Sequence, residues 1–144
     1  MRKWLIAIAV LVLALGANEV YAQMQLRQLM ANKLQASQKL LEAIATADFK
    51  KVTEQADQLT QLANQAEWMA YKTPKYELHS NEFRRAAETI SRKAKEKNLD
   101  GVTLAYMDLT MSCVRCHQYV RDVRDASLPN RSRSAVLANR SETR

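Results

Sequence analysis

Apolar side chains recur every three or four residues in four successive stretches of the chain, which is the spacing of one helix face. The stretches cover residues 26–44, 52–70, 83–94 and 102–123. Asp48 stands where it can cap the second helix, Pro74 where it can end that helix, and Asp100 near the start of the fourth. The pattern therefore predicts four helices, most of them about twenty residues long.

Residues that break helices are scarce after position 22, where only Gly101, Pro74 and Pro129 occur. Good helix formers such as Ala, Leu, Gln, Lys and Glu are abundant. Four such helices with short connections favour an all-α fold, an antiparallel up-down-up-down four-helix bundle. The apolar stripes are narrow and rich in alanine, so we expect a large apolar group to complete the core.

The first 22 residues have the organisation of a secretory signal peptide. Arg2 and Lys3 precede an apolar run at 4–15, and Val20-Tyr21-Ala22 forms a cleavage-like site with small residues at its outer positions. The run is shorter than the ~20 residues that span a bilayer, which argues against a stable membrane anchor. We therefore expect a signal peptide (1–22), a bundle domain (23–126) and a basic, disordered tail (127–144), in an exported protein, for example one of the periplasm.

The chain carries a net charge of +7. The predicted mature part holds 20 Lys and Arg against 14 Asp and Glu, and half of that excess lies in the last eighteen residues. An exported protein rarely meets nucleic acid, and the tail has no interleaved aromatic residues, so nucleic-acid binding is not expected. The basic balance suits an acidic protein partner or a tail that only aids solubility.

The segment MSCVRCHQYVR, residues 111–121, holds both cysteines and one of the two histidines. Cys-x-x-Cys-His is the attachment signature of c-type haem. On a helix, Cys113, Cys116 and His117 share one face, so both thiols can bond to one porphyrin edge while the imidazole reaches the iron. The three residues also continue the apolar stripe of the fourth helix, which points a covalently bound haem c into the core.

Three other uses of these residues are weaker. A Cys113–Cys116 disulfide suits an oxidising compartment but distorts a helix and leaves His117 without a role. A thioredoxin-like redox pair needs a β-α-β context. A structural zinc needs four ligands, and adding His79 would use every Cys and His in the chain.

The motif in the last helix of an exported four-helix bundle resembles the cytochrome c-prime family, and most closely its low-spin members with a methionine ligand. The resemblance covers residues 24–124. Cys113, Cys116 and His117 match the attachment site, and Arg121 matches a basic residue that often follows it. The position three after the histidine, usually aromatic in that family, is Val120 here, and the chain runs on for more than twenty residues.

The ligand on the iron face opposite His117 decides what such a protein does. If the fourth helix ends near Arg124, His117 lies about seven residues, or ~10 Å, from its end, and a similar distance in from Met24 on the first helix reaches Met30. The resemblance also implies a methionine ligand in the first helix. A core-filling role for Met30, a ligand role for Met69, and an open iron are the alternatives.

The favoured function is electron transfer through a haem iron held by His117 and Met30, with no catalytic residues, and a redox protein as partner. The alternative is a five-coordinate haem protein that binds nitric oxide or carbon monoxide. A peroxidase ranks last because no distal base is available, and a bundle without a cofactor leaves the Cys and His cluster unexplained.

Several further residues are candidates for roles near the haem. Trp68 and Phe83 are expected to wall it, Arg121 to pair with a propionate, and His79 to lie at the surface between the second and third helices. Relatives often pair through their first two helices, so a homodimer is also an expectation. The outer faces of those helices are nevertheless polar here, with Gln35, Gln38, Gln55, Gln58 and Gln61.

Overall fold

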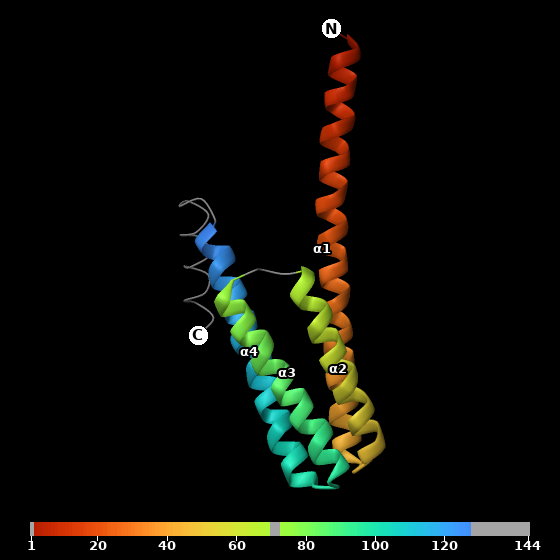
Figure 1. Cartoon of the computed structure of the whole chain (residues 1–144), viewed down its shortest axis with the longest axis vertical. Coiled ribbons are helices and arrows are strands. Elements are labelled where there is room, and N and C mark those ends of the chain that lie inside the picture. Colours follow the sequence, from red (N-terminus) through yellow and green to blue (C-terminus); the bar gives the residue numbers. More distant parts are fainter. Residues whose placement is uncertain (1, 70–72, 128–144) are drawn as a thin grey trace, which may run out of the picture.

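The computed structural model describes residues 2–69 and 73–127, which form four α-helices (Figure 1). Their bounds are α1 Arg2–Ala45, α2 Phe49–Met69, α3 Pro74–Lys95 and α4 Leu99–Ser127. Each helix packs against the next one in the chain, and α4 returns to α1. The all-helical, four-helix architecture predicted from the apolar pattern is confirmed.

The turns after α1 and α3 are built in the same way. Ala47 and Lys97 both adopt a left-handed backbone, with φ values of 54° and 55°. In each turn the following residue donates its backbone N–H to a carbonyl five residues earlier, at 2.9 Å for Asp48 and 3.0 Å for Asn98. This pattern closes a helix by satisfying its last carbonyl groups, and it reverses the chain within three residues.

Asp48 and Asn98, whose backbone N–H groups close these turns, also cap the helices that follow. Asp48 Oδ1 accepts the backbone N–H of Lys51 at 3.1 Å, and Asn98 Oδ1 accepts that of Gly101 at 2.8 Å. A side-chain acceptor at this position satisfies one of the free N–H groups of the first helical turn. The predicted capping role of Asp48 is confirmed.

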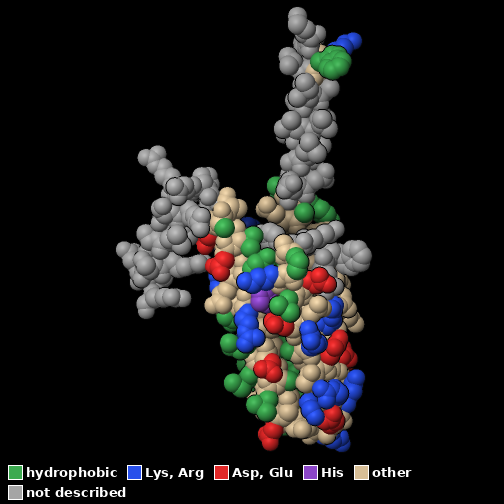
Figure 2. Space-filling model, turned by 60° about the vertical axis from the view of Figure 1, so that its left-hand side comes forward, with side chains coloured by type: hydrophobic (Ala, Val, Ile, Leu, Met, Phe, Trp, Pro, Cys, Tyr) green, Lys and Arg blue, Asp and Glu red, His purple; other side chains and the backbone are tan. Residues whose placement is uncertain are grey.

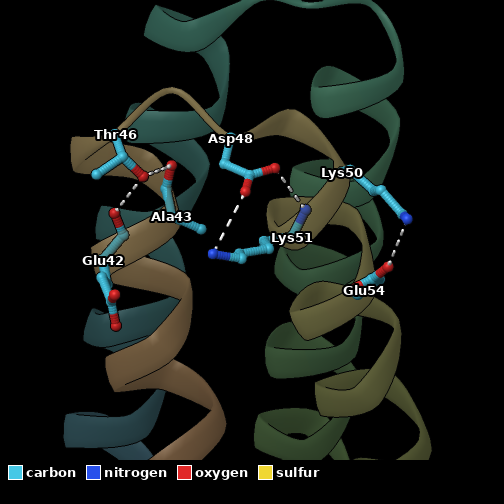
Figure 3. A network of polar contacts seen from close by, with 7 residues as sticks. All are labelled: Glu42, Ala43, Thr46, Asp48, Lys50, Lys51 and Glu54. Carbon is cyan, nitrogen blue, oxygen red and sulfur yellow. Dashed lines mark hydrogen bonds and ion pairs between the residues drawn. The ribbon is translucent and has the colours of Figure 1, made fainter.

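Further polar contacts surround the turn between α1 and α2 (Figure 3). The hydroxyl of Thr46 donates to the backbone carbonyl of Glu42 at 3.0 Å, and Lys51 Nζ lies 3.5 Å from Asp48 Oδ2. The hydrogen bond from the Lys51 backbone is the main reason why the pKa of Asp48 is lowered. This end of the bundle is thus fixed by short-range contacts between neighbours in the sequence.

The third helix begins nine residues earlier than its apolar stripe predicts. Thr73 is its N-cap, accepting the backbone N–H of Tyr76 at 3.2 Å, and Pro74 occupies the first turn. Proline suits that position because its fixed φ matches the helix and the missing N–H has no partner there. Pro74 therefore starts α3, and the structure corrects the expectation that 74–82 form a connection.

The core is most tightly packed near the turns that join α1 to α2 and α3 to α4. The largest fully buried side chains lie in the halves of the helices near this end; they are Leu40, Val52, Leu59, Ile90, Val102 and Leu109. Toward the other end the α1–α2 pair and the α3–α4 pair diverge (Figure 1). Cys113 lies at the middle of α4, and Cys116 and His117 follow it toward this divergent end.

The first helix is longer than the other three and extends beyond them at the upper end of Figure 1. It includes residues 2–22, the segment with the organisation of a signal peptide, without a break before the part that packs in the bundle. Within the described ranges, no helix has both the length and the hydropathy of a membrane span. The predicted tail lies almost wholly outside the described residues, since α4 ends at Ser127.

Candidate cofactor site on the fourth helix

The CxxCH motif lies in the middle of α4, where the inner face of that helix passes from buried to half-buried residues. Val102, Ala105, Leu109 and Ser112 are buried on this face. Cys113 continues it and packs against the core, and Cys116 is half-buried one turn later. His117 is exposed beside them. Both thiols thus lie on the half-buried part of this face, whereas the exposure of His117 corrects the expectation that all three residues continue the apolar stripe into the core.

Both cysteines are free thiols that face charged groups from two other helices. Burial raises the pKa of Cys113 and of Cys116, so both sulfurs are protonated at neutral pH. Lys33 of α1 acts in the opposite direction on both thiols, and Glu82 of α3 adds to the increase at Cys116. These pairings put α1, α3 and α4 together around the motif.

Lys33 of α1, which acts on both thiols, also lies over the ring of Phe83 of α3. Phe83 is 7% exposed, and Lys33 Nζ lies 4.6 Å from the centre of its ring, within the range of a cation–π interaction. Phe83 was predicted to lie here, whereas nothing in the local sequence around Lys33 or Glu82 signals proximity to the cysteines. Only the packing of three helices brings them together.

The register of α1 against α4 is set by a contact near the middle of the bundle. The Tyr106 hydroxyl lies 3.3 Å from Ser37 Oγ and donates to the Ser37 carbonyl at 3.3 Å. The helices are antiparallel, so seven residues back from Ser37 and seven on from Tyr106 bring Met30 level with Cys113. His117 is then one helical turn, about 6 Å, beyond Met30 along the axis.

The direction of the two side chains reduces the axial offset between Met30 and His117. Helical side chains lean toward the N-terminus of their own helix. In an antiparallel pair, Met30 therefore leans along the bundle toward the level of His117, and His117 leans toward the level of Met30. Met30 itself is half-buried.

His79 is buried, and the expectation that it lies at the surface is wrong. It is 9% exposed in the early turns of α3, its Nδ1 is 3.3 Å from Glu82 Oε2, and its ring centre is 5.8 Å from that of Tyr119. Tyr119 lies two residues after His117, and its hydroxyl is 2.8 Å from Thr73 Oγ1. Because α3 starts at Pro74, His79 points into the α3–α4 contact.

The Thr73 side chain should contribute to stability in two ways, as N-cap of α3 and as partner of Tyr119. We expect Thr73→Ala to lower the free energy of unfolding by about 1–2 kcal/mol, because a cap and a tertiary hydrogen bond are lost together. Tyr119→Phe should cost about half as much, since the cap remains. Urea titration checks both, and Thr73→Ser, which keeps the hydroxyl, should match the wild type; a Ser variant as unstable as Ala would contradict this.

The other predicted site residues differ in how they are placed. Arg121 is exposed on α4, one turn after His117. The side chains of Trp68 and Met69 lie outside the described residues. In the described part of the chain, no three His, Cys, Asp or Glu side chains gather closely enough to hold a metal ion.

The residues around the motif fit a covalently attached haem by their own chemistry. Two free thiols one turn apart match the two bonds that the porphyrin edge requires, and an imidazole follows at the next position. The His117 imidazole is exposed, which leaves its ring nitrogens uncovered. Comparison of the chain with protein-family models, with characterised proteins and with solved structures gave no match.

Proposed function

We propose that this protein is an exported c-type cytochrome that transfers electrons. Cys113 and Cys116 would hold haem c through thioether bonds, and His117 would bind the iron from the same helix. The observation that carries this proposal is the position of two free, half-buried thiols on the inner face of α4, followed by a histidine. When bound, the haem supplies a reversible one-electron iron couple.

Met30 is the proposed ligand on the opposite face of the iron. The Ser37–Tyr106 contact supports it: counted along the antiparallel helices, it brings Met30 near the level of Cys113, and helix geometry directs the Met30 side chain toward the level of His117. A His/Met pair keeps the iron six-coordinate in both oxidation states and raises the reduction potential above that of nitrogen-only ligand sets. Such a site exchanges electrons with little rearrangement.

The neighbouring side chains have roles that follow from their positions. Phe83 would supply an apolar wall, and Lys33 provides a positive charge beside the thiols, at the edge of the porphyrin that they would bind. Arg121, exposed one turn after His117, suits a propionate or a partner protein. Electrons would enter and leave by contact with a redox protein, and the excess of 20 Lys and Arg over 14 Asp and Glu in the predicted mature part favours an acidic one.

The alternative is an iron with one open position that binds nitric oxide or carbon monoxide. It has support in the one-turn offset between Met30 and His117, which a ligand pair must bridge by side-chain length alone. Carbon monoxide then distinguishes the two functions, because it binds an open ferrous iron readily and a His/Met iron poorly.

The test is the absorption spectrum of the purified protein, ferric and ferrous, with and without carbon monoxide. Electron transfer predicts low-spin bands, a weak long-wavelength band from methionine–iron ligation in the ferric form, and little change with carbon monoxide. High-spin bands and a large shift with carbon monoxide would favour gas binding. A colourless protein with the mass of the bare polypeptide, from a host that attaches haem c, would overturn both.

A further inference from the structure

The outer face of α4 carries an apolar stripe that no other described helix covers. Its members are Leu104, Met107, Met111 and Val114, which are 65%, 60%, 50% and 44% exposed. They point away from the core because Val102, Ala105 and Leu109 occupy the opposite side of the same helix. Figure 2 shows hydrophobic side chains along the left-hand edge of the lower bundle.

The spacing within this outer stripe is three, four and three residues. That is the seam of a two-stranded coiled coil, in which each helix supplies side chains at alternating intervals of three and four. The four side chains expose roughly 400 Å² per chain, an area comparable to the largest apolar patch of a typical monomer, which is often functional. Two copies with their flanking residues approach the ~1,000 Å² that a specific interface needs.

We propose that the outer stripe binds the same stripe of a second copy of this chain, with the two α4 helices antiparallel. The two-fold axis passes beside residue 109, midway along the stripe. Met107 then packs against Met111 of the partner subunit, and Leu104 against the partner's Val114. Every residue of the stripe meets a residue of the stripe, as an interface with two-fold symmetry requires.

The charges that flank the stripe support the antiparallel arrangement. Asp108 and Arg115 are exposed on the same side of the seam, seven residues apart. In this register, Asp108 leans toward the partner's Arg115 and Arg115 toward the partner's Asp108, since each side chain leans toward its own N-terminus. Two symmetric ion pairs therefore border the seam.

A parallel pairing lacks this complementarity. The flanking positions that meet across a parallel seam would set Asp108 opposite Thr103 and Arg115 opposite Thr110, so neither charge finds an opposite one. The antiparallel dimer is favoured for that reason.

This interface differs from pairing through the outer faces of α1 and α2. The side chains that α1 and α2 expose include several glutamines: Gln35, Gln38, Gln58 and Gln61. The stripe on α4 is instead formed by four exposed apolar side chains at helical spacing.

Sedimentation velocity of the purified protein at about 100 µM should show a dimer, as expected for a dissociation constant in the micromolar range. Met111→Asp puts two carboxylates beside the axis and should raise the dissociation constant by ~100-fold or more. Leu78→Asp, at a 50% exposed leucine of α3, is the matched control and should remain dimeric. The measurement uses the purified full protein and reports its oligomeric state, not its haem content or redox activity, so its outcome is distinguishable from that of the proposed function.

A charge exchange tests the register. Asp108→Arg alone brings like charges together at both pairs and should weaken the dimer about tenfold. Adding Arg115→Asp should restore the affinity to within ~3-fold. A monomer at 100 µM, a dimer unaffected by Met111→Asp, a charge exchange without rescue, or a stripe that binds only an unrelated protein would overturn the proposal.

Discussion

Replacing both Cys113 and Cys116 with serine should give a colourless polypeptide with no covalently attached haem. Serine is nearly the same size but lacks the thiol that bonds to the porphyrin edge, so both covalent links are lost together. We also expect a lower midpoint in thermal unfolding, because the narrow, alanine-rich helices lose the group that completes their core. Intact-mass measurement and circular dichroism check the two effects.

The control for this variant is a second pair of serines in the same helical turn. Val114→Ser with Arg115→Ser changes exposed positions between the cysteines, and the haem should remain attached. Haem that survives acid–acetone extraction in the Cys113→Ser, Cys116→Ser protein would contradict the assignment of these residues.

The second large effect is expected from Met30→Ala. Haem should stay attached, since the thioethers are intact, but the iron should lose its sixth ligand and become high-spin. The ferric methionine–iron band should disappear, ferrous protein should bind carbon monoxide, and the reduction potential should fall. Absorption spectra and a redox titration measure all three changes.

Met24→Ala is the matched control for Met30, because Met24 lies on the same helix and is 63% exposed. Its spectrum should equal that of the wild type. A low-spin spectrum that persists in Met30→Ala would reject Met30 as the ligand and direct attention to Met69.

Much of the fold follows from local sequence. The apolar period locates four helices, and Asp48 caps α2 as its position suggests. The start of α3 was predicted too late because residues 74–82 carry few aliphatic side chains on the inner face. Tyr76, His79 and Ser80 fill that face instead, and their burial depends on contacts with α4.

Part of the candidate site could likewise be predicted from local sequence, and part of it could not. The shared face of Cys113 and Cys116 follows from helical geometry alone. Lys33, Glu82 and the bond between Thr73 and Tyr119 do not, since they connect residues 34 to 83 positions apart in the sequence. Their positions depend on how α1, α3 and α4 pack together. The amino-acid sequence alone gives no signal for this packing.

The core is fully buried near the α1–α2 and α3–α4 turns and more open at the other end. This difference bears on the order of folding and haem attachment. The half with the fully buried side chains, near the α1–α2 and α3–α4 turns, contains none of the proposed haem ligands. That half can therefore form first and hold the remaining helix ends in approximate position. The enzymes that attach the haem would then meet helices already held in approximate position. Packing of the divergent end would be completed by the haem itself.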